Sequence, residues 1–182
     1  LDLEALANHR SSVLGAIPGL PQPSQKRFDT LVWDTLRRFD PAQPVYIESE
    51  SKKVGNVSLS TALVEAMRAS TCLNLLMPDE QRVALLMEDY DYLVRDVAYF
   101  CDRLSVLTSH QGRAVVERWQ AQARSGDFAP VVHDLLKKHY DPAYMQSMQR
   151  NFALFKESKI IAPNDRSERA MACLAREILA LA

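Results

Sequence analysis

The sequence is short of glycine and cysteine, and it carries no excess of charge of either sign. Its 182 residues include five glycines and no glycine-rich phosphate-binding loop, so this stretch alone is excluded as a self-sufficient P-loop enzyme. A formal net charge of −1 gives no global basic field, so an anionic partner must be bound by local clusters. The three cysteines (Cys72, Cys101, Cys173) lie far apart without CxxC or Cys/His spacing, which argues against zinc and disulfides and predicts buried free thiols.

Long hydrophobic runs and metal-ligand spacings are also missing. No apolar segment is long enough to cross a bilayer and no signal peptide is visible, so we expect a cytoplasmic protein without a membrane partner. The four histidines share no ligand spacing, and no Gly-x-Ser-x-Gly elbow or Cys/His pair stands out. The residues therefore predict neither a metal centre nor a serine or cysteine nucleophile.

One stretch, residues 44–55, organises the rest of the chain. Val45-Tyr46-Ile47 predicts a buried strand, and the acidic Glu48 and Glu50 follow it before Ser51, Lys52 and Lys53. Ligands of open α/β sheets bind just beyond the carboxyl ends of the strands, which makes this change from apolar to acidic to basic a candidate site. The alternative is a strand that ends in a solvated turn.

The order of predicted elements indicates an α/β fold. Residues 1–78 hold short strands at 45–50 and 72–77 between helices, residues 79–155 are almost wholly helical with a break at Asp141-Pro142, and residues 156–182 hold a strand at 159–162 and a last helix. A capping box at 165–168 is expected to open that helix. We predict a thin parallel sheet with a large helical insertion. Because the chain opens in mid-pattern with few strands, we expect a fragment that has more strands upstream.

Apolar residues at helical spacing predict which faces are buried. Ser24 is expected to cap a helix that runs to about Phe39, and a second helix is expected to start at residues 59–61. The predicted core positions are Phe28, Leu31, Val32, Leu36 and Phe39 in the first helix, Leu63 and Met67 in the second, and Val83, Leu86, Met87, Tyr90, Leu93, Val97, Phe100, Leu104 and Leu107 further on.

Two further charged clusters stand near predicted element ends. The first contains Asp2, Glu4, His9 and Arg10. The second is the run from Lys137 to Tyr144, in which two lysines, a histidine and two tyrosines surround the predicted helix break. Cations beside aromatic rings suit a phosphate backbone and an unstacked base. Taken singly, each cluster is more typical of a solvated face.

Four separated motifs in order resemble tRNA 2-selenouridine synthase across nearly the whole chain. They are residues 2–10 (DLEALANHR), 22–25 (QPSQ), 47–55 (IESESKKVG) and 139–144 (HYDPAY). The resemblance implies a P-loop NTPase-like parallel sheet, incomplete here, preceded by a rhodanese domain in the same polypeptide. It implies replacement of sulfur by selenium in the wobble 2-thiouridine of tRNA, with selenophosphate as the donor and an S-geranyl intermediate formed from geranyl diphosphate. Without the phosphate loop and the rhodanese cysteine, this chain alone is expected to be inactive.

The resemblance also implies roles for individual residues. Glu48 and Glu50 are the expected catalytic residues, and Mg²⁺ or a water is expected beside Glu48. Two positions depart from the family pattern, since glycine is expected at Ser11 and proline at Ser60. The expected phosphate-binding residues are Arg10, Ser51, Lys52 and Lys53, and the expected tRNA-binding residues are His9, Gln22, Gln25, Lys137, Lys138, His139, Tyr140 and Tyr144.

Two other functions fit parts of the pattern. A nucleotide-dependent, kinase-like P-loop protein would use residues 79–155 as a lid, and selectivity for geranyl diphosphate over ATP separates it from the transferase. A non-catalytic helical interaction module would be insensitive to loss of charge at Glu48 or Lys52.

The transferase hypothesis predicts that charge at residues 48–53 is needed for turnover. In the full-length protein, Glu48→Gln or Lys52→Ala should cut the turnover of 2-thiouridine tRNA while the fold stays intact. The measurements are nucleoside analysis of the tRNA and circular dichroism of each variant. Wild-type turnover in both variants would remove the site assignment.

Overall fold

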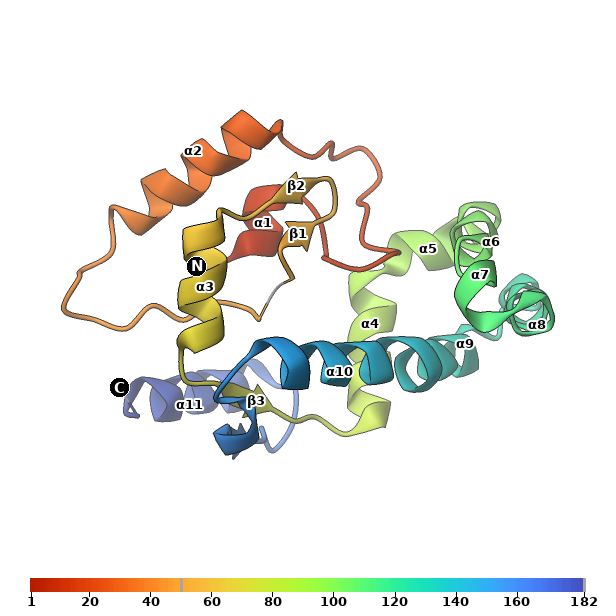
Figure 1. Ribbon diagram of the computed structural model, residues 1–182. Coiled ribbons are helices and arrows are strands. Elements are labelled where there is room, and N and C mark those ends of the chain that lie inside the picture. The colour runs from red at the N-terminus through yellow and green to blue at the C-terminus, as the bar shows by residue number, and fades with distance from the viewer. Residues whose placement is uncertain (50, 182) are drawn as a thin grey trace.

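Helices make up most of the fold, with two small pairs of strands between them (Figure 1). The structure is a computed structural model that describes residues 1–49 and 51–181. The helices are α1 (Leu3–Ala7), α2 (Gln25–Leu36), α3 (Thr61–Ala69), α4 (Asp79–Asp89), α5 (Asp91–Arg95), α6 (Val97–Ser105), α7 (Thr108–Gln111), α8 (Arg113–Arg124), α9 (Phe128–Leu135), α10 (Asp141–Asn151) and α11 (Glu168–Leu179), with a π-helical turn at Leu136–Tyr140 and a 3₁₀ turn at Phe155–Glu157.

Serine side chains start three of these helices. Ser24 accepts a hydrogen bond from the Arg27 amide at 3.3 Å, and Ser60 accepts one from the Leu63 amide at 3.3 Å. Both predicted helix starts are therefore confirmed, and serine at position 60 supplies a cap. The predicted capping box at 165–168 is out of register. Ser167 is the residue that caps α11, while Asp165 accepts a bond from the Ser167 amide at 2.7 Å.

The strands form one antiparallel and one parallel pair. Strands β1 (Lys53–Val54) and β2 (Val57–Ser58) make a hairpin, and β3 (Leu73–Leu75) pairs in parallel with β4 (Lys159–Ile161). The predicted α/β class and the strands near 72–77 and 159–162 are confirmed. The apolar run at 72–77 predicts a buried strand, and this burial is wrong, because Leu75 is 57% exposed and a two-stranded ladder has no neighbour to cover it.

The strand predicted at 45–50 does not form over its described residues. Residues 44–49 are extended without a ladder, and Val45 and Tyr46 are exposed. The amino-terminal nitrogen of Leu1 donates to the Tyr46 carbonyl at 2.6 Å, and the Tyr46 hydroxyl donates to the Ile178 carbonyl at 2.9 Å. These single bonds fix the segment, but they do not bury the apolar side chains on which the prediction rested. Glu50 lies outside the described residues.

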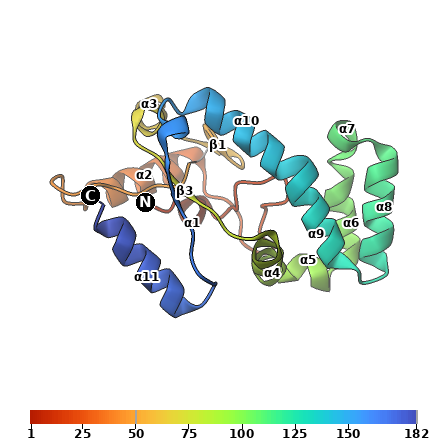
Figure 2. The ribbon, with the colours of Figure 1, turned by 90° about the horizontal axis from the view of Figure 1, so that it is seen from below.

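The helix break predicted at Asp141-Pro142 is wrong. Seen from below, α9, the π turn and α10 form one continuous rod (Figure 2). The Asp141 amide bonds to the Leu136 carbonyl five residues back, which is the π pattern. A proline in a regular helix lacks a donor and clashes with the carbonyl four residues before it. The wider turn just ahead of Pro142 lets the helix continue.

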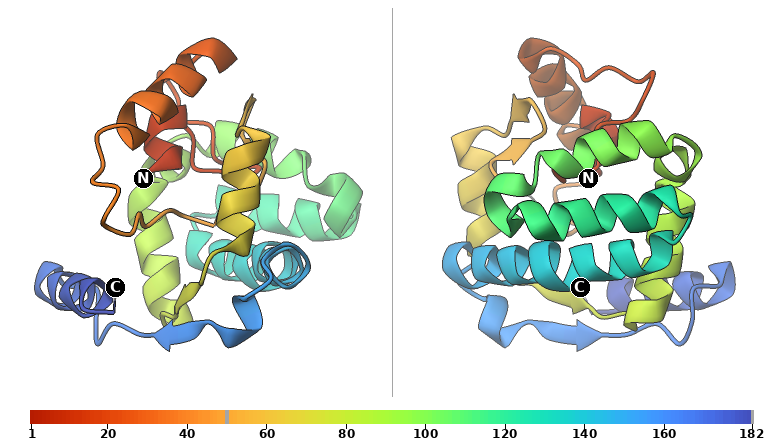
Figure 3. Two further views of the ribbon diagram at one scale, coloured as in Figure 1. Left: turned by 60° about the vertical axis from the view of Figure 1, so that its left-hand side comes forward. Right: turned by 90° about the vertical axis from the view of Figure 1, so that its right-hand side faces the viewer.

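Two hydrophobic cores hold the chain together. The first joins the α1–α3 portion and the hairpin to the end of the α9–α10 rod, and the second fills the space between α5, α6, α8 and α9, which pack as a bundle (Figure 3). The first core contains Leu3, Ala7, Phe28, Val54, Val57, Leu59, Val64, Met67, Met148, Phe152 and Phe155. The second contains Leu93, Phe100, Cys101, Leu104, Leu107, Val116, Trp119, Ala123 and Val131.

Most predicted core positions lie inside these clusters or against them, but several do not. The predicted stripe on α4 is only half-buried and lies outside both clusters, as do two positions of α2; these residues are Val83, Leu86, Met87, Leu31 and Leu36. Phe39 is exposed because α2 ends at Leu36, three residues before it. The predicted burial of all thiols is wrong as well. Cys101 is buried, Cys72 is half-buried with its pKa raised by burial, and Cys173 is exposed on α11. All three cysteines are free. Across residues 1–49 and 51–181, no helix is both long and apolar enough to span a membrane.

A matched pair of glycine substitutions should measure how strongly the hairpin is held. Gly55 has φ +60°, and a Cβ there would overlap the Gln22 side-chain amide, whereas Gly126 has φ +82° and open space around it. Gly126→Ala should cost about 1 kcal/mol from backbone strain alone. Gly55→Ala should cost about 1–3 kcal/mol more, because the hydrogen bonds of Gln22 must also break. Urea unfolding of both variants tests this, and equal losses would contradict it.

Candidate functional site

The loop that carries His9 and Arg10 is folded tightly on itself. His9 pairs with Ala16 in an isolated antiparallel bridge, and the Arg10 amide donates to the Gly15 carbonyl at 2.9 Å. A Cβ on Gly15 would lie 2.9 Å from backbone atoms of Arg10 and Ser12, so only glycine fits there. Ser11 has φ +40°, a conformation that glycine adopts at less cost, which gives a physical reason for the expected glycine. The loop 9–16 therefore presents Arg10 in a fixed position.

Arg10 is bound from the side by the end of α4. Its guanidinium lies 3.2 Å from the Asp89 carboxylate and 5.1 Å from the centre of the Tyr90 ring. The Tyr90 hydroxyl lies 3.4 Å from Ser12, and burial raises the pKa of Tyr90. Because the Arg10 side chain is still 32% exposed, it can contact a ligand without leaving these partners.

The helical region holds the far end of the same loop. The Tyr92 hydroxyl donates to the Ala16 carbonyl at 3.3 Å, and Arg103 on α6 donates to the Val13 carbonyl at 2.8 Å. Burial raises the pKa of Tyr92 to about 12, so this donor keeps its proton. Loop 9–16 is thus attached to α4, α5 and α6 at several points.

Glu48 lies at the start of α1. Its carboxylate accepts a hydrogen bond from the Glu4 amide at 3.0 Å and another from the Leu3 amide. A carboxylate at a helix N-terminus satisfies free backbone donors and is favoured by the helix dipole. The structure therefore places Glu48 as a brace between the 44–49 segment and α1. Its predicted catalytic role stays a prediction. The sequence analysis expects Glu48→Gln to leave the fold intact, whereas the structure predicts that this variant folds with lower stability, because it removes the charge that braces α1.

Ser51, Lys52 and Lys53 continue from this segment into the hairpin. The Ser51 hydroxyl donates to the Lys53 carbonyl at 2.6 Å and accepts from the Lys53 amide at 3.2 Å, so it forms a turn. Both lysine side chains are exposed, and neither forms an ion pair with a residue that the structure describes. Their charges are available for an anion.

Gln22 and Gln25, which the sequence assigned to tRNA, bind the hairpin. The Gln22 amide donates to the Ala7 carbonyl at 3.1 Å and the Val54 carbonyl at 3.0 Å, and it accepts from Asn56 at 2.7 Å. Gln25 donates to the Ser58 carbonyl and accepts from the Ser58 amide, both at 2.8 Å. These side chains therefore add hydrogen bonds to the backbone of the hairpin. Contact with tRNA stays a prediction for both.

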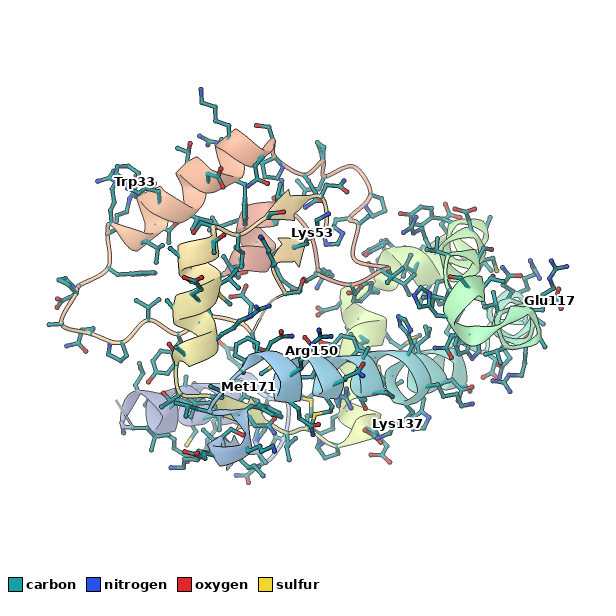
Figure 4. The ribbon with its side chains drawn as sticks, viewed as in Figure 1. Trp33, Lys53, Glu117, Lys137, Arg150 and Met171 are labelled. Carbon is teal, nitrogen blue, oxygen red and sulfur yellow. The ribbon has the colours of Figure 1, made fainter. Side chains whose placement is uncertain are left out.

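The two lysines of the 137–144 cluster are ion-paired in this structure. Lys137 lies 2.6 Å from Asp79, and Lys138 lies 2.8 Å from Asp134. The bond from Lys137 holds the pKa of Asp79 below its usual range, and the bond from Lys138 does the same for Asp134. Lys53 on β1 and Lys137 on the α9–α10 rod stand on separate parts of the molecule (Figure 4). The predicted basic residues do not form one patch.

The aromatic residues of the 137–144 cluster connect it to the 44–49 segment. Tyr140 and Tyr144 stack with ring centres 5.6 Å apart, and the Tyr144 hydroxyl lies 2.7 Å from the Ser49 hydroxyl. His139 is half-buried beside His110, and burial first and His110 second lower its pKa. The structure thus brings together residues from two predicted clusters that lie 95 positions apart in the chain.

Sequence reasoning missed three residues that contact Arg10 or its loop, because it assigned no functional role to Asp89, Tyr90 or Arg103. The apolar stripe through Tyr90 indicated a core position, and no spacing signal links it to Arg10.

Within the described part of the chain, no group of three or more His, Cys, Asp or Glu side chains is arranged to hold a metal ion. The Mg²⁺ expected at Glu48 remains a prediction. In the structure, Oε1 of Glu48 already accepts hydrogen bonds from the Leu3 and Glu4 amides.

Comparison with known families identifies the domain. The family model of the tRNA 2-selenouridine synthase AAA domain matches residues 1–106, which is more than half of the chain. Residues 1–106, which run from α1 to the end of α6, therefore belong to a domain of the AAA class. The chain belongs to the tRNA 2-selenouridine synthase family.

Individual relatives agree with this placement. A tRNA 2-selenouridine synthase of Alcanivorax borkumensis is 30% identical over 189 residues, covering 87% of this chain and 52% of that protein. One from a Sulfurovum species is 26% identical over 178 residues, covering 83% and 49%. One from Marinobacter nauticus is 37% identical over 92 residues, covering 50% and 25%. The chain thus spans about half the length of these relatives or less, and no solved structure matches it.

The buried state of His9 predicts a pH dependence of stability. Burial first and the charge of Arg103 second lower the pKa of His9 from its usual value of about 6.5. Below that value the unfolded chain binds more protons than the folded chain, so the free energy of unfolding should fall as the pH drops from 7 to 5. His9→Gln should reduce this slope, measured by urea unfolding at several pH values. An unchanged slope would show that His9 does not contribute.

Proposed function

We propose that this chain is part of a transferase that converts wobble 2-thiouridine in tRNA to 2-selenouridine. Selenophosphate supplies the selenium, and the route passes through an S-geranyl intermediate formed from geranyl diphosphate. The observation that carries the proposal is the family match over residues 1–106, which includes Arg10 and Lys52. In the first step a carbon–sulfur bond forms at the uridine sulfur as the bond from geranyl carbon to diphosphate oxygen breaks. Cations near that oxygen stabilise the leaving diphosphate.

Two exposed lysines, which form no ion pair with a described residue, support a phosphate-binding role for the 51–53 turn. Lys52 and Lys53 are exposed at the base of a hairpin that is held rigid by Gln22 and Gln25. Arg10 adds a guanidinium that binds phosphoryl oxygens in a fork. We propose that Arg10, Ser51, Lys52 and Lys53 bind diphosphate or selenophosphate and that Glu48 and Glu50 act beside them. Glu48 also positions α1, which leads directly to the His9–Arg10 loop.

We propose a P-loop-like sheet as the framework of this site. The extended 44–49 segment lies beside the first residues of the chain, and β3 and β4 run in parallel. The exposed apolar side chains Val45, Tyr46, Leu75 and Leu76 are suited to further strands of the complete polypeptide, which also carries a rhodanese domain.

The tRNA is proposed to contact the α9–α10 rod. Tyr140 is exposed and stacked on Tyr144, which gives an aromatic surface for an unstacked base. Lys137 and Lys138 contact the backbone if phosphates replace Asp79 and Asp134 as their partners. His9, Gln22, Gln25 and His139 complete the proposed tRNA-binding set.

The test uses the complete polypeptide with 2-thiouridine tRNA, geranyl diphosphate and selenophosphate. Digested tRNA is analysed by mass spectrometry, and geranylated or selenated uridine is the expected result. Lys52→Ala should slow the reaction about 10–100-fold through loss of a charge-assisted contact, while Lys26→Ala on α2 serves as the matched control and should not. Unchanged thiouridine together with ATP turnover would favour the kinase-like alternative, and equal rates in both variants would favour a site elsewhere.

A further inference from the structure

Three buried nitrogen atoms that find no hydrogen-bond partner among the described residues belong to loop 9–16 or to α6, which is bound to it. They are Nδ1 of His9, Nε of Arg10 and Nε of Arg103. Buried donors in folded proteins are nearly always paired, because an unpaired one loses its bonds to water without replacement. Three such atoms at one loop therefore require an explanation.

Arg103 has no counter-ion among the residues that the structure describes. It extends from α6 and donates one bond, from Nη2 to the Val13 carbonyl at 2.8 Å. Among the residues described, no carboxylate lies within ion-pair distance of its guanidinium. Its charge nonetheless acts on His9. A half-buried cation that faces a backbone carbonyl and an imidazole has an unmet demand for negative charge.

Arg10 supplies a second cation on the same loop. Asp89 and Tyr90 fix the guanidinium by an ion pair and a ring contact, but Nε is left unpaired. Asp89 neutralises only one of the two arginine charges. The loop between them is shaped by the close packing at Gly15 and by the positive φ of Ser11.

We propose that His9, Arg10 and Arg103 form an anion-binding site under loop 9–16 that takes the phosphoryl oxygens of a diphosphate. Arg103 is the new member of the site, and it lies 93 residues from Arg10. Two guanidinium groups and an imidazole suit the oxygens of such an anion, which would supply hydrogen-bond partners and negative charge at this loop. Assigning the anion to the prenyl donor's diphosphate rests on the proposed function, whereas the binding site itself rests on the unpaired donors.

The experiment measures binding of inorganic diphosphate to this chain by isothermal titration calorimetry. Arg103→Gln should weaken binding about 10–100-fold, the usual effect of losing a charge-assisted hydrogen bond. Asp89→Asn should strengthen binding several-fold, because it removes a competing carboxylate from Arg10. Arg113→Gln, which removes an exposed cation at the start of α8, should leave the affinity unchanged and controls for net charge. Urea unfolding checks that each variant is folded.

Arg103→Gln and Asp89→Asn are expected to change the affinity for diphosphate in opposite directions, which makes the outcome decisive. Wild-type affinity in a folded Arg103→Gln variant, or no diphosphate binding by the wild-type chain, would overturn the site. If Arg103→Gln is unfolded, Asp89→Asn decides, and no gain in affinity overturns it. Diphosphate binding with tRNA left unmodified by the complete polypeptide would uphold the site and contradict the proposed function. Modification of tRNA without diphosphate binding would contradict the site alone.

Discussion

The carboxylate of Glu48 at the start of α1 is the contact on which the arrangement of the first 60 residues depends. α1 has five residues, too short to be stable by its own backbone bonds. Its free amides at Leu3 and Glu4 are satisfied by a side chain 44 or more residues away, which binds α1 to the segment at 44–49. Asp2 adds a local cap through the Ala5 amide at 2.7 Å. The position of α1 then sets where His9 and Arg10 begin.

Side-chain amides likewise hold the β1–β2 hairpin in place through hydrogen bonds to distant backbone groups. A hairpin with two residues in each strand is marginal alone. Gln22 joins it to the end of α1, and Gln25 adds a rung at Ser58 from the first turn of α2. Val54 and Val57 are buried in the first core as a result. Lys52 and Lys53 therefore stand on a rigid base although they are exposed.

The helical region contributes to the candidate site as well as to the bulk of the fold. Loop 9–16 is bound by Asp89, Tyr90 and Arg103, which come from the end of α4, the residue after it, and α6. The π turn keeps α9 and α10 in one rod, so that the rod reaches from the second core to Met148 and Phe152 in the first. Tyr144 contacts Ser49 from this rod. A change in the position of the bundle would thus be transmitted to Arg10 and to the 44–49 segment.

The sequence by itself determined the features that depend on near neighbours. Ser24 and Ser60 act on amides three residues away, and the apolar stripes of α2 and α6 repeat within a few turns, so these helices could be predicted. The four motifs likewise identified the family. Only the tertiary structure decided that Glu48 caps α1, that Gln22 and Gln25 bind the hairpin, that Pro142 continues a helix, and that Arg103 lies at the loop of Arg10. Each of these rests on contacts or a turn geometry that periodicity and composition do not record, because the chain must fold before such groups can meet.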